Sequence, residues 1–207
     1  MVDSRESERV RRFYDEYATD YDRWMCFYDA IMLGDARRKV CSRASGRTLE
    51  LAIGTGLNLP FYPDGVRLTG VDLSPAMLAV AEQRSRKLDI DAELLVGDAH
   101  ALNFPNDRFD TVVSTLFFSS VPRPRQAAAE VLRVLKPGGR LLLLDHVRSQ
   151  IWAVRFVEQL LDLPSRRFAG CHLLRDPLDY LGAAGFRVER RDRSRWGIVL
   201  EVVARKI

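Results

Sequence analysis

The stretch Glu50-Leu51-Ala52-Ile53-Gly54-Thr55-Gly56-Leu57-Asn58 decides the fold of this chain of 207 residues. It begins as an apolar strand and ends in a turn that contains two glycines. Glycine lets a ligand approach the backbone closely, and the start of a following helix offers free N–H groups. Many turns between a strand and a helix need glycine for geometry alone, so the interpretation depends on the residues that follow.

Asp72 ends the next apolar run, eighteen residues beyond Gly54. A carboxylate at that place can accept hydrogen bonds from both hydroxyls of a ribose, so the two features predict a ligand of the adenosine type. A dinucleotide is disfavoured, because its fingerprint needs a third glycine where Leu59 stands. Asp98, which follows Gly97, offers an acceptor for the adenine amino group, and its alternative role is that of a turn former.

Short apolar runs alternate with helical stretches from Thr48 onward, which predicts a parallel α/β fold. The helical stretches are 75–87, after the N-cap residue Ser74, and 126–135. A last helix over 176–185 precedes two strands joined near Trp196-Gly197, and we expect those strands to form an antiparallel edge. The apolar runs are 48–54, 67–73, 92–98, 109–118 and 140–147.

Two helical segments lie outside this alternation. The first carries an aromatic stripe in steps of three, four and seven, which predicts an N-terminal helical cap over 1–45. The second is an amphipathic insertion over 148–175. We predict one domain over 1–207, with a nucleotide-binding core over 46–147 and the last helix and edge strands over 176–207. The stripe consists of Val10, Phe13, Tyr14, Tyr17, Tyr21, Trp24 and Tyr28.

The composition is that of an ordinary globular protein, with 47% apolar and 29% charged residues. No apolar run approaches the roughly 20 residues of a membrane span, and the charged N-terminus is unlike a secretory signal, so we expect a cytosolic protein. Cys26, Cys41 and Cys171 are scattered, which indicates neither a disulfide framework nor a metal site. The net charge of +4 and the pI near 9.1 favour anionic partners.

Four stretches, 49–58, 70–86, 97–116 and 130–147, resemble the class I S-adenosylmethionine (SAM)-dependent methyltransferases in order and spacing. The resemblance implies a Rossmann-like α/β fold: a mostly parallel seven-stranded sheet with an antiparallel edge, an N-terminal helical cap and SAM as the cofactor. One departure is Ala52, which replaces the glycine usual at the first position of the loop. We expect a modest backbone adjustment there without loss of binding.

The resemblance also implies which residues hold the cofactor. They are Glu50, Ala52, Gly54, Gly56 and Asn58 near the methionine tail, Asp72 at the ribose, Leu73, Met77, Asp98 and Ala99 around the adenine, and Ser114, whose backbone carbonyl meets the methionine ammonium. In such enzymes, tyrosines of the N-terminal helix close over the tail, so Tyr17 and Tyr21 are further candidates. The alternative is a helix that only docks its apolar face on the domain.

Methyl transfer from a sulfonium is an in-line displacement, so alignment of the reactants supplies most of the acceleration. An acceptor that is protonated at pH 7 needs a base. The candidate catalytic residues are His146 and Asp145 at the end of the run 140–147, with Tyr21 from the cap. His100 also lies where loops cover the cofactor. The alternative for each histidine is a role in packing.

More narrowly, the chain resembles bacterial phosphatidylethanolamine N-methyltransferases and the related quinone methyltransferases. The motifs are Tyr21-Asp22 after the stripe, shared by both families, and the stretches 54–63 and 170–175, which resemble phospholipid- and thiol-methylating enzymes. The resemblance implies N-methylation of a phospholipid amine. C- or O-methylation of a quinone or other small hydrophobic acceptor, methylation of a thiol, and SAM binding without transfer stay open as alternatives.

The segment Ser114–Phe118 lacks the Asp/Asn-Pro-Pro-Tyr motif of many enzymes that methylate nucleic acids, so a nucleic-acid acceptor is not expected. A lipophilic acceptor would suit a groove lined by aromatic side chains, although the same side chains could form core. The sequence gives no indication of the oligomeric state. The aromatic side chains are Phe117, Phe118, Trp152 and Phe156.

Aromatic and basic residues together predict reversible association with an anionic membrane surface, at the inner face of the membrane. The competing interpretation buries the apolar residues against the sheet and leaves the arginines as a solvated face. The residues concerned are Arg5, Arg9, Arg11, Arg12 and Arg23 beside the N-terminal stripe, and Ile151, Trp152, Phe156 and Leu160 near Arg148, Arg155, Arg166 and Arg167.

Overall fold

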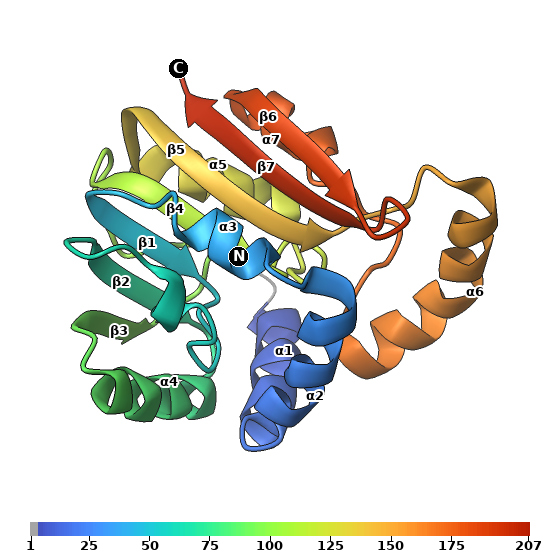
Figure 1. Cartoon of the computed structure of the whole chain (residues 1–207), viewed down its shortest axis with the longest axis horizontal. Coiled ribbons are helices and arrows are strands. Elements are labelled where there is room, and N and C mark those ends of the chain that lie inside the picture. The colour runs from blue at the N-terminus through green and yellow to red at the C-terminus, as the bar shows by residue number, and fades with distance from the viewer. Residues whose placement is uncertain (1–3) are drawn as a thin grey trace.

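Seven strands form one mixed sheet in the computed structural model, which describes residues 4–207 and the side chains of 6–167 and 170–207 (Figure 1). The order across the sheet is β3-β2-β1-β4-β5-β7-β6, and the five strands β3, β2, β1, β4 and β5 run parallel to one another. The predicted Rossmann-like sheet is therefore confirmed. The strands are β1 Arg47–Leu51, β2 Arg67–Asp72, β3 Ala92–Val96, β4 Phe109–Thr115, β5 Leu135–His146, β6 Phe186–Ser194 and β7 Val199–Lys206.

The antiparallel edge forms as predicted. β7 runs antiparallel to β5, with His146 opposite Val199, and β6 and β7 form a hairpin. Arg195, Trp196 and Gly197 all have positive φ in its turn. β5 begins at Leu135, earlier than the sequence indicated, because the segment before the apolar run already pairs with β4.

The helices of the core flank this sheet. α4 (Pro75–Leu88) begins where predicted, since the Ser74 hydroxyl accepts the N–H of Met77 at 3.1 Å. α5 (Pro124–Val134) and α7 (Leu178–Ala184) pack together over one face. A central cluster including Leu49, Val112 and Leu143 is fully buried. These contacts fix the carboxyl ends of β1 to β4 at one edge, where their loops meet.

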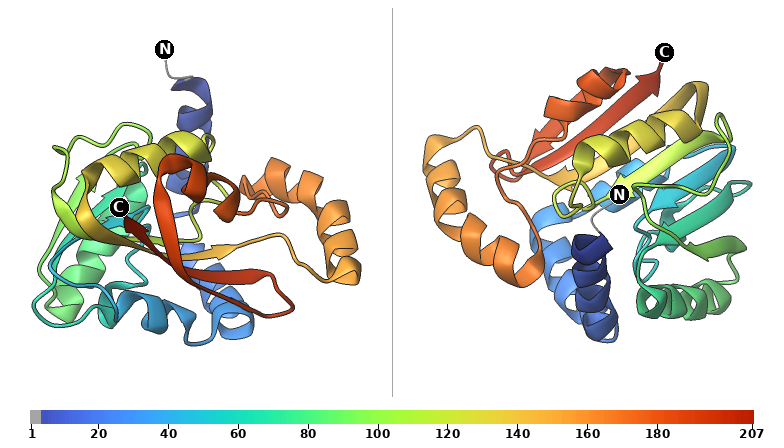
Figure 2. Two further views of the ribbon diagram at one scale, coloured as in Figure 1. Left: turned by 90° about the horizontal axis from the view of Figure 1, so that it is seen from above. Right: turned by 180° about the vertical axis from the view of Figure 1, so that it is seen from behind.

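The N-terminal cap is helical but is not one continuous helix. α1 (Ser4–Tyr17) and α2 (Tyr21–Tyr28) are separated by a turn in which the Asp20 N–H donates to the Tyr17 carbonyl at 3.1 Å. A π-helix (Asp29–Leu33) and α3 (Ala36–Cys41) follow. The turn rotates α2, so the stripe does not stay on one buried face and Trp24 is 70% exposed. Both α1 and α2 lie at the carboxyl ends of the parallel strands (Figure 2).

The insertion forms α6 (Trp152–Ala169), which lies within the predicted insertion over 148–175. Figures 1 and 2 show α6 standing out from the body of the domain, beyond the ends of β5 and β7. Among the described residues, no helix has the length and apolar character that crossing a membrane requires.

Candidate functional site

A pocket of about 750 Å³ lies at the carboxyl edge of the parallel strands, where the cap covers their loops. This is the edge at which open α/β sheets bind ligands. Its lining comes from the cap and from the loops after β1, β2, β3 and β4. The lining residues include Ser7, Val10, Tyr14, Tyr21, Ala52, Asp72, Leu73, Met77, Asp98, Ala99, His100, Thr115, Leu116, Phe117 and Ser120.

Asp72 ties two loops together in this pocket. Its Oδ2 accepts the N–H of Gly54 at 2.8 Å, and its Oδ1 accepts the N–H of Ser74 at 2.9 Å. Burial raises the pKa of the carboxyl, and these backbone donors oppose that rise. A carboxylate has about four acceptor positions, so two stay available for the hydroxyls of a ribose.

The pocket beside Asp72 fits an adenosine. Leu73 and Met77 offer apolar walls for a flat base, and Ala99 adds a third apolar contact. Asp98 brings a second carboxylate, an acceptor for an exocyclic amino group. Two acceptors and three apolar side chains in one pocket are the groups that a ribose and an adenine need.

His100 is engaged as a positioning residue for Asp98. Its Nδ1 lies 2.5 Å from Asp98 Oδ1, and its Nε2 accepts the N–H of Arg123 at 3.2 Å. Burial acts to raise the pKa of Asp98, but the hydrogen bonds from His100 hold it below its ordinary value. Asp98 also accepts the backbone N–H of His100 at 2.9 Å, so it forms the turn that the sequence offered as an alternative.

A smaller pocket of about 260 Å³ adjoins the first and shares Tyr21, Ala52 and Thr115 with it. Asn58, predicted at the methionine tail, lines this second pocket. Glu50 lies behind Asn58 and accepts its Nδ2 at 2.6 Å. Burial raises the pKa of Glu50 to about 7, although its hydrogen-bond donors oppose the rise. Glu50 therefore does not line the pocket itself but lies behind Asn58, which does.

Arg37 is a member of the smaller pocket that the sequence did not reveal. Its Nη1 donates to Asn58 Oδ1 at 3.1 Å and to Thr115 Oγ1 at 3.3 Å, while its Nε donates to Asp29 at 2.6 Å. The signal was present in the sequence, because Arg37 lies four residues from Leu33 and four from Cys41, which are both apolar and buried. An arginine in that place is buried only where acceptors pair with it.

The loop after β1 contains a strained alanine. Ala52 has a φ of 50°, so it keeps the left-handed conformation natural to glycine, and the expected backbone adjustment is not what the structure shows. Gly56 is required by packing, since a Cβ there would lie 2.7 Å from Leu59 Cδ1. Gly54 has open space around its missing Cβ and donates to Asp72. Neither glycine lines the two pockets.

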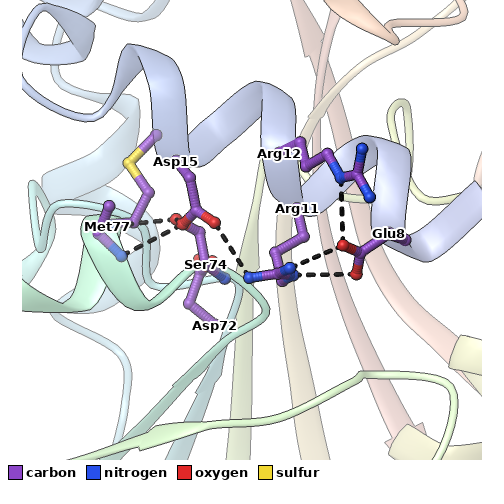
Figure 3. Close-up of polar contacts among 8 residues, drawn as sticks. Glu8, Arg11, Arg12, Asp15, Asp72, Ser74 and Met77 are labelled. Atoms are coloured by element: carbon purple, nitrogen blue, oxygen red, sulfur yellow. Dashed lines mark hydrogen bonds and ion pairs between the residues drawn. The ribbon is translucent and has the colours of Figure 1, made fainter.

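The cap is held over the main pocket by two carboxylates. Asp15 of α1 accepts the Ser74 hydroxyl at 2.6 Å and the Ala76 N–H at 3.3 Å, at the N-terminus of α4 (Figure 3). Asp22 of α2 accepts the Thr55 hydroxyl at 2.6 Å and pairs with Arg84. These contacts close the cap on the loops that surround the pocket.

The cap places two tyrosines in the main pocket. Tyr14 and Tyr21, seven residues apart, both line it, and their rings lie 6.3 Å apart. Tyr17 lies outside it, 47% exposed and packed on Phe13. Burial raises the pKa of Tyr21 to about 12, so its phenol stays protonated. The helical step of seven was the signal by which Tyr14 could have been found.

Asp145, His146 and Ser114 are buried outside the main pocket's lining. Asp145 accepts the backbone N–H groups of Phe118 and His146 at 2.6 and 2.8 Å. Burial lowers the pKa of His146 to about 4, and its Nε2 lies 3.9 Å from Glu158. The residues that follow Ser114, namely Thr115 and Leu116, line the pocket in its place.

The expected aromatic groove does not form. Phe117 lines the main pocket, but Phe118 is fully buried against Tyr180. Trp152 and Phe156 are 78% and 57% exposed on α6, so they cannot share a groove with the other two. The apolar residues of the insertion therefore belong to the exposed surface of α6 and not to the pocket.

Comparisons with known proteins agree with this geometry. The methyltransferase domain family matches residues 49–143. A phosphatidylethanolamine N-methyltransferase from Cereibacter sphaeroides is 34% identical over 155 residues, 71% of this chain and 76% of that protein. A demethylmenaquinone methyltransferase from Renibacterium salmoninarum is 34% identical over 152 residues, 70% of this chain and 61% of that protein. Thiol S-methyltransferases match as well.

A SAM-dependent methyltransferase of known structure from Thermotoga maritima has a TM-score of 0.74, covering 95% of this chain and 99% of that one. At 20% identity, this likeness shows the fold. The match to the phosphatidylethanolamine enzyme extends through most of both proteins, and the match to the domain family includes the loops that carry Gly54 and Asp72. The chain therefore belongs to the class I SAM-dependent methyltransferases, and SAM is its cofactor.

Proposed function

We propose that the protein methylates the amine of phosphatidylethanolamine and its methylated derivatives at a membrane surface. The observation that carries this proposal is the outer face of α6, which is apolar and basic and is exposed to solvent. The cofactor pocket, in contrast, is covered by the cap. A lipid acceptor explains an exposed apolar face, because an enzyme bound to the membrane by that face could reach the lipid while the lipid stays in the bilayer. The relationship to a phosphatidylethanolamine N-methyltransferase supports the same substrate class.

The side chains of α6 are divided between two faces. Its acids turn inward, where Glu158 accepts the N–H of Ser149 at 2.9 Å and Asp162 accepts the N–H of Leu173 at 2.8 Å. The outward face is apolar, contrary to the interpretation that buries it against the sheet. This exposed face consists of Ile151, Trp152, Phe156, Val157, Leu160, Leu161 and Leu163.

Basic residues accompany the apolar face. Arg148 precedes the helix, Arg155 lies within it, and Arg166 and Arg167 end it. Near an anionic surface each cation contributes about 1 kcal/mol, and apolar side chains enter the headgroup boundary. The side chain of Arg5, named in the same prediction, lies outside the described residues. Trp24 and Phe27 of α2 are also exposed and add apolar area on the cap.

Methyl transfer from SAM requires few catalytic side chains. Bound SAM supplies an electrophilic methyl group on a sulfonium. An ammonium placed among Val10, Leu116 and Phe117 loses hydration, which favours its neutral, nucleophilic form. Tyr21, kept protonated by burial, can orient the acceptor by a hydrogen bond. Asp145, which also accepts the N–H of His146, is proposed to support the wall behind the pocket through the backbone of Phe118.

Incubation with methyl-labelled SAM and a total lipid extract, followed by chromatography, tests the acceptor. We expect label in phosphatidylethanolamine derivatives. Label in a quinone would favour the second candidate, which rests on the relationship to a demethylmenaquinone methyltransferase. Label in a low-molecular-weight thiol would favour an S-methyltransferase. No labelled product, with SAM bound, would indicate a SAM-binding protein without transferase activity.

Vesicle sedimentation tests the membrane surface. We expect the protein to pellet with anionic vesicles at low ionic strength and to be released by salt. Changing Phe156 and Leu160 to Ser should abolish pelleting, whereas Leu88→Ser, which alters an exposed leucine on α4, should not. Failure to pellet with anionic vesicles, or equal pelleting with neutral ones, would overturn the membrane proposal and favour a soluble acceptor.

A further inference from the structure

A second cavity, with about 390 Å³ of space, opens beside the main pocket between α1 and the end of α6. The two cavities share Val10, Tyr14 and Ser120, which separate them as a common wall. The shared wall means that a ligand in one cavity lies directly against the other.

Three arginines surround the second cavity. Arg9 comes from α1, and Arg166 and Arg167 come from the last turn of α6, so residues far apart in the sequence converge there. Arg166 has an acid nearby, Asp162, at 3.7 Å. Within the part of the chain that the structure describes, Arg9 and Arg167 form no salt bridge. The cavity therefore holds more positive charge than its surroundings neutralise.

His172, close to the same arginines, reports this positive potential. Burial, and after it the charges of Arg175, Arg166 and Arg9, together lower its pKa to about 4. Of the charges acting on His172, only that of Asp162 raises its pKa among the principal causes. The region thus disfavours a further cation and favours an anion.

We propose that Arg9, Arg166 and Arg167 bind the phosphate of the acceptor lipid, while its amine enters the main pocket across the shared wall. This inference rests on the proposed function and assigns the headgroup site. Four covalent bonds join the nitrogen of ethanolamine to the phosphorus, so the two groups need neighbouring cavities. Guanidinium groups match phosphate oxygens in charge and geometry. The position of Arg166 and Arg167 on α6 also links headgroup binding to the helix that faces the membrane.

The binding test uses glycerophosphoethanolamine, the soluble headgroup, and the whole protein with S-adenosylhomocysteine. Calorimetry should detect its binding, and the double variant R9Q/R167Q should bind it at least tenfold more weakly, since a hydrogen bond to a charged group contributes more than a neutral one. The control R86Q/R187Q removes the same charge from two exposed positions outside the cavity. It should bind the headgroup as the unmodified protein does.

Unchanged headgroup affinity in R9Q/R167Q would overturn the proposal, and so would binding of inorganic phosphate without binding of the headgroup. Activity supplies the second readout: the variant should raise KM for phosphatidylethanolamine in neutral micelles at least tenfold and leave the Kd of SAM unchanged. If the unmodified protein binds the headgroup through these arginines but methylates no phospholipid, the proposed function fails while the phosphodiester site stands.

Discussion

Removal of the Asp72 carboxylate should separate its role in cofactor binding from its role in the loops. We expect Asp72→Ala to weaken SAM binding at least tenfold. Two acceptor positions of the carboxylate are occupied by Gly54 and Ser74, which leaves two for the ribose hydroxyls. Each hydrogen bond to a charged group contributes about 1.5 kcal/mol or more, so losing two corresponds to about a hundredfold in Kd.

The same substitution should lower the free energy of unfolding by about 1–3 kcal/mol, because two buried N–H groups lose their acceptor. Burying the charged carboxylate is itself unfavourable, as its raised pKa indicates. Removing the carboxylate removes this cost and offsets part of the loss in stability. The protein should therefore stay folded, within the 5–15 kcal/mol typical of domains at about 25 °C. Titration calorimetry measures Kd and urea unfolding measures stability. Asp64→Ala, at an exposed position, is the control. Unchanged SAM affinity in a folded Asp72→Ala protein would refute the ribose assignment.

Three further substitutions test the site. Ala52→Gly should stabilise the protein by about 0.5–1 kcal/mol in urea unfolding, because it relieves a left-handed φ that costs about 1–2 kcal/mol for an L-residue, less the greater unfolded-state entropy of glycine. Ala79→Gly, on an exposed position of helix α4, should instead destabilise it, and the same sign for both would contradict the strain. Glu50→Gln should remove a pH dependence. With a folded pKa of about 7 above an ordinary value of 4.5, the folded state keeps a proton that the unfolded state has lost, so stability should fall as pH rises across this interval, by on the order of 3 kcal/mol. Unfolding measured at pH 5 and pH 8 should show a smaller difference in the variant; equal differences would place Glu50 at an ordinary pKa. Tyr14→Phe should keep SAM affinity within threefold while Tyr14→Ala weakens it, because the ring forms the wall of the pocket, and equal affinities in a fluorescence titration would exclude that contact.

The local sequence predicted the core of the site because its signals are local. Glycines follow one strand and Asp72 ends the next. Because the two strands are parallel neighbours, their ends lie at the same edge of the sheet, where the Gly54 N–H donates to Asp72. The cap of helix α4 at Ser74 likewise depends on residues three apart. Patterns of this kind need no knowledge of distant packing.

Residues whose surroundings come from distant segments could not be assigned in the same way. His146 follows a strand in a position that suits a base, yet β7 and α6 bury it away from the pocket. Tyr14, and not Tyr17, lines the pocket because α1 docks with the face that carries Ser7 and Val10 toward the loops of the sheet. Arg9 and Arg167 are remote in the chain, and only folding brings them to one cavity.

The sequence by itself determined the α/β alternation, the glycine loop after the first strand and the acid that ends the next strand, because strand ends, glycines and helix caps act over a few residues. Only the tertiary structure decided whether the apolar face of α6 is core or surface. An amphipathic helix has the same pattern in both settings, since the pattern records that one face avoids water but not what will cover it. The hydrogen bonds that Glu158 and Asp162 accept from the domain orient the helix. They place the acidic face toward the domain and the apolar face toward solvent.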